Sequence, residues 1–168
     1  MGPYLHIIFW TCLSPVIYTY LVSPMFTILI ARSKKQVIPI QNQEYPSISI
    51  LIAAYNEELV IENKIKSILN SSYPKEKIEI IIGTDQCSDR TNAIVEQYVK
   101  QNENLYHIPF NERSGKIKII NSLYERAKGD VLILTDANVI FTEDTLSQMT
   151  LHFANYDVGL VDSHMKNF

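Results

Sequence analysis

The chain has 168 residues and a formal net charge of −3, from 15 basic and 18 acidic side chains that are interspersed along it. This balance argues against a nucleic-acid partner, because proteins that bind nucleic acids concentrate Lys and Arg on one face. Its two cysteines, Cys12 and Cys87, provide neither a disulfide framework nor the spacing of a zinc site. The length allows one globular domain at most, once the apolar N-terminus is set aside.

The N-terminus is apolar, with no Asp, Glu, Lys or Arg between residues 4 and 31. A helix needs roughly 20 such residues to cross a bilayer, so we expect residues 1–31 to form a transmembrane anchor. A cleaved signal peptide fits poorly, since no basic residue precedes the run and no small-x-small site follows it. A buried soluble helix is the other alternative. Arg32, Lys34 and Lys35 follow directly, and the positive-inside rule then predicts a single-pass protein of the inner or plasma membrane with its domain in the cytoplasm.

Residues 32–46 are predicted to be a polar linker, in which two prolines disfavour regular structure. From residue 47 to residue 168, short apolar runs alternate with helical patterns. This alternation predicts an α/β fold with a mainly parallel, Rossmann-like sheet. The expected strands are 48–53, 78–82, 105–108, 131–135 and 158–161, and the expected helices are 57–70, 90–101, 116–128 and 143–153.

Three of the predicted strands are followed within three residues by Asn or Asp, namely Asn56, Asp85 and Asp136. In a parallel sheet these ends share the edge at which open α/β folds bind ligands, so the three loops should converge on one cleft. Asp136 and Asn138 offer a carboxylate and an amide oxygen, which suit a hard divalent cation that bridges phosphates. The alternative is that these two residues merely form a turn. Asn56 is expected to cap the helix that follows it.

Other polar residues near the strand ends also have two interpretations. Asp85 could accept hydrogen bonds from a base and a ribose, or it could form a turn or a helix cap that serves Thr91. Arg113 and Lys116, at the start of a predicted helix, suit an anion or are ordinary solvated charges. Neither the Walker nor the Rossmann glycine pattern is present, so a phosphate would have to be held by a cation and basic side chains. Cys87 has no evident histidine partner and is not expected to be a nucleophile.

Together these segments resemble the inverting family 2 glycosyltransferases of the GT-A fold. The resemblance covers about residues 10–162, and it is the ordered series of motifs that is specific. An aromatic stretch before Pro24 is similar to the start of membrane-tethered members. The matching segments are 49–57, 73–74, 79–91, 115–116 with Asn121, and 129–138.

The resemblance implies the donor half of a sugar-nucleotide site. Ala54, Tyr55 and Glu57 would line the base and the ribose, and Asp85 would hold the base. Lys116 would lie near the diphosphate of the nucleoside diphosphate sugar. Arg113, as a possible anion ligand, is grouped with these nucleotide-binding residues.

The resemblance also implies a divalent metal, Mg²⁺ or Mn²⁺, held by Asp136 and Asn138. Such an ion would neutralise the departing nucleoside diphosphate. Two residues depart from the family pattern. Asn138 replaces the second carboxylate of an Asp-x-Asp pair, which should weaken metal binding without abolishing it. Thr84 stands where many members carry an acidic residue.

In the family, the acceptor half and its catalytic base follow at this point, so we identify no catalytic residue before Phe168 and expect the chain to be truncated at its C-terminus. The leading hypothesis is a membrane-tethered transferase domain that uses a UDP-sugar. One alternative is a non-catalytic nucleotide-sugar-binding remnant, or a subunit of a split enzyme whose acceptor half is a separate polypeptide. Another is a phosphohydrolase with Asp136 as nucleophile, although such enzymes usually have a second Asp where Asn138 stands.

Overall fold

The structure is a computed structural model that describes residues 2–33, 45–155 and 157–163. The chain divides into two compact units, Met1–Ile38 and Pro39–Phe168. Most of the predicted linker, 32–46, lies outside the described residues, as do Lys34 and Lys35.

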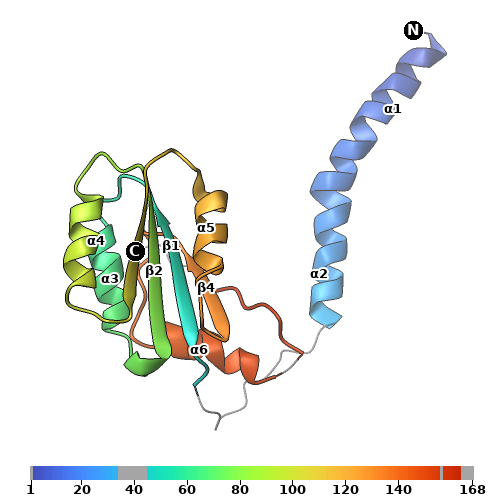
Figure 1. Cartoon of the computed structure of the whole chain (residues 1–168). Coiled ribbons are helices and arrows are strands. Elements are labelled where there is room, and N and C mark those ends of the chain that lie inside the picture. The colour runs from blue at the N-terminus through green and yellow to red at the C-terminus, as the bar shows by residue number, and fades with distance from the viewer. Residues whose placement is uncertain (1, 34–44, 156, 164–168) are drawn as a thin grey trace. The chain divides into compact units, whose positions relative to one another are not determined.

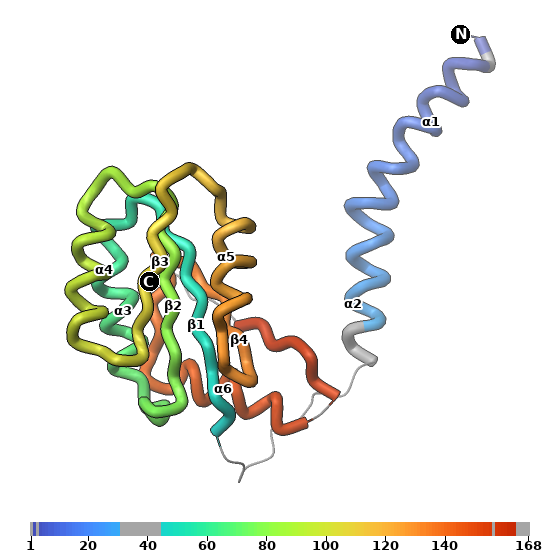
Figure 2. The backbone as a smooth tube through the Cα atoms, viewed as in Figure 1, coloured from blue at the N-terminus to red at the C-terminus, as the bar shows by residue number. Residues whose placement is uncertain are grey.

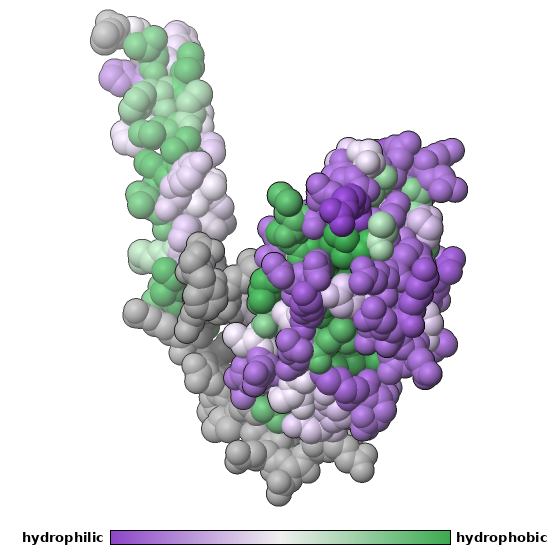
Figure 3. Space-filling model, turned by 90° about the vertical axis from the view of Figure 1, so that its left-hand side faces the viewer, coloured by the Kyte–Doolittle hydropathy of each residue, from purple (hydrophilic) through white to green (hydrophobic). Residues whose placement is uncertain are grey.

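The N-terminal unit is helical from end to end. It consists of α1 (Pro3–Ile17), the π-helical turn η1 (Tyr18–Val22) and α2 (Ser23–Ser33). Within the described part of the chain, one helix is long and apolar enough to span a membrane, the 27 residues Tyr4–Ile30. At 1.5 Å per residue this length corresponds to about 40 Å, against ~30 Å of bilayer hydrocarbon. Hydrophobic side chains cover most of its surface (Figure 3), so its length and composition suit the predicted anchor.

The second unit is built on a four-stranded sheet with the order β3–β2–β1–β4 (Figure 2). Each of its three pairings is parallel, and Ile48 of β1 lies opposite both Ile78 of β2 and Val131 of β4. The predicted α/β fold with a parallel sheet is therefore confirmed. The strands are β1 (Ile48–Ala54), β2 (Ile78–Asp85), β3 (Leu105–Phe110) and β4 (Val131–Thr135).

Helices cover both faces of this sheet (Figure 1). Helices α3 (Ile61–Leu69) and α4 (Thr91–Val99) lie on one face, and α5 (Lys116–Tyr124) lies on the other. Successive side chains of a strand point to opposite faces. The larger core therefore contains alternate residues of β1 and β2 with the buried side of α3, and Leu51 and Ile81 pack under α5 in a second core. The remaining helices are α6 (Thr145–Leu151) and the short 3₁₀ turns η2 (Lys75–Lys77) and η3 (His152–Ala154).

The helix predicted to start at residue 57 begins instead at Ile61, and Asn56 does not cap it. Asn56 has a positive φ of 51°, and its Oδ1 accepts the amide hydrogen of Ser88 at 2.9 Å. The amide of Glu57 donates to the Thr91 hydroxyl at 2.8 Å. The cap prediction is wrong because Ser88, in the loop before α4, and Thr91, the first residue of α4, bind these groups.

The predicted strand 158–161 is also wrong. Residues 157–163 include no strand, and Leu160 is 87% exposed. An apolar run forms a strand only where a neighbouring strand takes its backbone hydrogen bonds. Within the described residues, only β1 pairs with β4, so the sheet ends at β4 on this side. Residues 158–161 therefore have the apolar pattern of a strand, but among the described residues no strand pairs with them.

Gly129 lies two residues before β4, where its backbone packs tightly against β1. Its amide donates to the Ser49 hydroxyl at 2.8 Å, and a Cβ at this position would overlap the backbone of Ser49 and lie 2.6 Å from the carbonyl carbon of Ile48. We expect Gly129→Ala to lower the free energy of unfolding by about 1–3 kcal/mol, the usual cost of overpacking. Urea unfolding of the full chain in detergent measures this change.

Gly159→Ala is the matched control, because a Cβ at Gly159 meets nothing within 4 Å. We expect its unfolding midpoint to equal that of the unaltered chain. Equal midpoints for the two alanine variants would contradict the close approach of Gly129 to β1.

Candidate functional site

The carboxyl ends of β1, β2 and β4 surround a hollow of about 270 Å³. Its walls come from segments far apart in the sequence, because parallel strands bring all their carboxyl ends to one edge. All eight residues predicted to bind nucleotide or metal line it, so the predicted convergence of the loops is found; what these residues bind stays a prediction. The predicted residues are Ala54, Tyr55, Glu57, Asp85, Arg113, Lys116, Asp136 and Asn138, and the others in the lining are Ala53, Gly115, Ile119 and Ala137.

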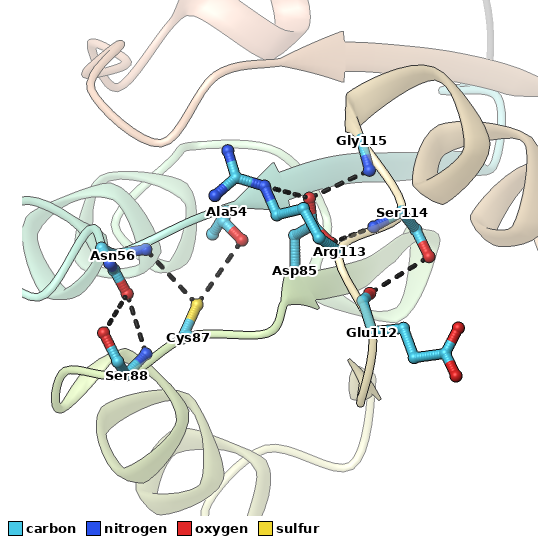
Figure 4. Close-up of polar contacts among 9 residues, drawn as sticks. All are labelled: Ala54, Asn56, Asp85, Cys87, Ser88, Glu112, Arg113, Ser114 and Gly115. Atoms are coloured by element: carbon cyan, nitrogen blue, oxygen red, sulfur yellow. Dashed lines mark hydrogen bonds and ion pairs between the residues drawn. The ribbon is translucent and has the colours of Figure 1, made fainter.

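Asp85 organises one wall of the hollow (Figure 4). Its side chain is buried, with Oδ1 accepting the amide hydrogen of Ser114 at 2.7 Å and Oδ2 accepting that of Gly115 at 3.0 Å. The Arg113 Nε lies 3.4 Å from the same Oδ2. Gly115 has a φ of +79°, a conformation that favours glycine. Asp85 therefore fixes the turn that leads into α5, a role that the sequence analysis missed.

The alternative in which Asp85 serves as a cap for Thr91 is wrong. The amide of Thr91 donates instead to Oδ1 of Asp89 at 3.0 Å. Burial raises the pKa of the Asp89 carboxyl, but the hydrogen bonds from Thr91 and from the amide of Glu58 outweigh it and hold this pKa below its usual value. Asp85 is thus directed to the hollow and not to α4.

Arg113 is more than a solvated charge. Its guanidinium lies over the ring of Tyr55, 3.5 Å from the centroid, while it pairs with Asp85. A cation over an aromatic face gains on the order of 0.5–1 kcal/mol when exposed. Tyr55 is still 42% exposed, so both flat groups remain accessible to a planar ligand.

Cys87 joins two loops at the side of the hollow (Figure 4). Its Sγ accepts the amide hydrogen of Asn56 at 3.4 Å and lies 3.7 Å from the carbonyl oxygen of Ala54, to which it donates. These long sulfur contacts hold the β1 and β2 loops side by side. Cys87 is absent from the lining of the hollow.

Thr84, the residue that departs from the family pattern, faces away from the hollow. Its buried hydroxyl lies 2.8 Å from Nε2 of His107, and the other ring nitrogen of His107 lies 2.6 Å from Glu96. The departure therefore affects the contact between β2 and β3 and not the lining of the hollow.

Lys116 and Asp136 face each other across the mouth of the hollow. The Lys116 Nζ forms an ion pair with Oδ1 of Asp136, and both side chains are more than half exposed. An exposed pair of this kind is worth about 0–1 kcal/mol, so a stronger partner can separate it. Lys116 is the first residue of α5, which places its charge beside the unpaired amides of the helix start.

The donors available to a divalent cation are few. Across residues 2–33, 45–155 and 157–163, no three His, Cys, Asp or Glu side chains gather in a way that could hold a metal ion. Asp136 and Asn138 line the hollow together and supply one carboxylate and one amide oxygen. Mg²⁺ commonly binds through one or two carboxylates with the remaining positions filled by phosphate oxygens and water. The pair therefore fits a cation that arrives with a diphosphate.

Lys64 is a buried residue near the hollow that the sequence analysis did not identify. Its side chain has no solvent exposure, and its Nζ donates to the Thr135 hydroxyl at 2.9 Å. Burial lowers the pKa of Lys64 to about 7, and the negative charge of Asp136 partly offsets this. The sequence does contain a feature that could have identified Lys64. Its spacing from Ile61 and Ile68 places it on the apolar side of α3.

Comparison with known proteins assigns this arrangement to a family. Residues 49–167 match the family model described as Glycosyl transferase family 2. The chain belongs to this family. The predicted resemblance to this family is thus confirmed.

Individual relatives agree with the assignment. The chain is 37% identical over 99 residues to the probable glycosyltransferase YdaM of Bacillus subtilis, covering 57% of this chain but only 24% of YdaM. It superposes with a TM-score of 0.75 on a mannosyltransferase, PcManGT of Pyrobaculum calidifontis, in complex with GDP-Man and Mn²⁺. That match covers 86% of this chain and 44% of PcManGT at 24% identity, which shows the fold alone. TarS of S. aureus in complex with UDP-GlcNAc matches at 26% identity and a TM-score of 0.57, over 61% of this chain and 29% of TarS.

The role of Asp85 can be tested by removing one acceptor. Asn at position 85 would present an N–H group to one of the two amides, so we expect Asp85→Asn to speed hydrogen exchange at Ser114 and Gly115 by roughly tenfold or more. Asp130→Asn is the matched control, since Asp130 accepts hydrogen bonds from Ser47, a residue just before β1. Unchanged exchange at Ser114 and Gly115 in Asp85→Asn would show that Asp85 does not hold this turn.

Proposed function

We propose that this chain binds a nucleoside diphosphate sugar in the hollow at the carboxyl edge of its sheet, with a UDP-sugar as the preferred donor. The single observation that supports this best is the composition of the hollow. One wall offers an aromatic ring and a guanidinium, Tyr55 and Arg113, and the opposite side carries Lys116 beside Asp136 and Asn138. A nucleotide has the same division, with a planar base at one end and a diphosphate at the other.

The base and ribose would lie against Ala54, Tyr55 and Glu57. Asp85 would accept a hydrogen bond from the base, since each of its oxygens has more than one acceptor position. Its present bonds to the turn at Ser114 and Gly115 fix the direction of those positions.

The diphosphate would lie at the start of α5. Amides at a helix start attract anions, and Lys116 would leave Asp136 to pair with a phosphate oxygen, because a diphosphate carries more charge than one carboxylate. The freed Asp136 carboxylate, together with Asn138, would then hold Mg²⁺ or Mn²⁺. When bound, the cation would supply Lewis-acid help to the departing diphosphate. Divalent metal also occurs in a structural relative, PcManGT, which was determined with Mn²⁺.

Transfer would proceed with inversion at the sugar carbon, assisted by a base that deprotonates the acceptor hydroxyl. The chain spans 24% of the length of YdaM, and the acceptor site with its base is proposed to lie outside the matched region, in another segment or a separate polypeptide. UDP is chosen over GDP on the likeness to TarS, whose complex contains UDP-GlcNAc.

The donor site is tested by nucleotide binding. We expect the full chain in detergent to bind UDP at least several-fold more tightly with Mn²⁺ than with EDTA, measured by titration calorimetry. Asp136→Ala should abolish this difference, because Asn138 alone is a poor ligand for a hard cation. Asp157→Ala, which removes an exposed carboxylate elsewhere, is the matched control. Binding that is absent, or indifferent to EDTA, would refute the proposal.

We further propose that the N-terminal helix anchors the chain in the inner or plasma membrane, with the second unit, Pro39–Phe168, in the cytoplasm. The support is the 27-residue apolar helix Tyr4–Ile30, followed in the sequence by Arg32, Lys34 and Lys35. The chain should then stay in the membrane fraction through high salt and alkaline carbonate, and a chain that lacks residues 1–31 should leave it. Release of the full chain by carbonate would disprove the anchor.

A further inference from the structure

The segment that carries Asp136 and Asn138 is held from α3, on the larger core side of the sheet. The Lys64 Nζ donates to the Thr135 hydroxyl at 2.9 Å and to the carbonyl oxygen of Val139 at 2.7 Å. These two acceptors lie on either side of the predicted metal ligands. One ammonium group thereby fixes both ends of the turn.

Further contacts from the same helix extend this attachment. The Lys64 Nζ also lies 3.4 Å from the centroid of the Phe141 ring, so this ammonium group contacts two oxygen acceptors and one aromatic face. The Ser67 hydroxyl, one turn further along α3, accepts the amide hydrogen of Phe141 at 3.2 Å. The segment 135–141 is therefore tied to α3 at four points, three of which belong to Lys64.

A buried lysine is an unfavourable choice if its only role is to hold a loop to a helix. Its side chain is fully buried, and among the described residues no carboxylate lies within 4 Å of its Nζ. Burying an ammonium group without an ion-pair partner is unfavourable, and an apolar side chain of the same length would fill the space without that cost. The contacts that compensate this cost are two hydrogen bonds and one aromatic contact, and all three hold the segment that carries the predicted metal ligands.

We propose that Lys64 is a positioning residue that sets Asp136 and Asn138 toward a single cation. The inference rests on the proposed function and adds to it a residue that does not line the hollow. Two ligands can hold a cation only if their separation and direction are fixed, and partners behind metal ligands commonly contribute 10–100-fold in metal affinity. The two hydrogen bonds of Lys64 impose that restraint on the backbone at Val139 and on the side chain at Thr135.

The first test needs no ligand. Hydrogen exchange of the full chain in detergent should show the amides of 136–141 exchanging roughly tenfold faster in Lys64→Met, with those of 114–116 unchanged. Met keeps the length of the stem and removes the ammonium. Lys66→Met is the matched control on the same helix, since Lys66 is exposed and pairs with Glu62. Unchanged exchange over 136–141 in a folded Lys64→Met protein would overturn the proposal.

The second test separates this role from general stability. We expect Lys64→Met to weaken the Mn²⁺-dependent part of UDP binding by 10–100-fold and to leave binding in EDTA unchanged. Equal losses with and without Mn²⁺, or no loss, would overturn the positioning role. If Lys64→Met does not fold, Thr135→Val decides the matter, because it removes one acceptor of Lys64 at constant volume and should shift both readouts in the same direction by a smaller factor. Failure of the unaltered chain to bind UDP would refute the proposed function, and hydrogen exchange would still decide whether Lys64 fixes the turn.

Discussion

The arrangement of the hollow depends on the buried carboxylate of Asp85 at the end of β2. It accepts hydrogen bonds from two consecutive amides of the turn before α5 and pairs with Arg113, which in turn lies over Tyr55. One side chain thus connects the loops that follow β1, β2 and β3. The parallel sheet brings the loops to one edge, and the hydrogen bonds of Asp85 decide which groups of these loops face the hollow.

The opposite side of the hollow is governed by charge. Asp136 forms an ion pair with Lys116 at the mouth of the hollow. A carboxylate that is already paired with an ammonium group has little attraction for a free divalent ion. A nucleoside diphosphate changes this balance, because it draws Lys116 away from Asp136 and adds oxygen ligands of its own. Cation binding and nucleotide binding at this site are therefore expected to depend on each other.

Much of this arrangement follows from local sequence patterns, and the exceptions have physical reasons. The strand runs and the polar residues at their ends specify the sheet and its binding edge, since an apolar run between turn residues has few alternatives. The hydrogen bonds of Asp85 to Ser114 and Gly115 could not be predicted from the sequence, because these partners lie 29 and 30 residues away. The cap prediction for Asn56 and the strand prediction for residues 158–161 were wrong for the same reason. Whether a residue caps a helix or joins a sheet depends on which distant backbone groups are available to it. The sequence shows that Lys64 interrupts the apolar face of a helix. It does not show which groups accept its hydrogen bonds.

Joint binding of nucleotide and cation at Asp136 and Asn138 can be measured by adding paramagnetic Mn²⁺ to the full chain in detergent, with and without UDP, and recording the broadening of backbone amide signals. We expect strong broadening at residues 136–138 and 115–116 when UDP is present and little broadening with Mn²⁺ alone. Equal broadening without UDP, or broadening centred away from these residues, would contradict joint binding at this site.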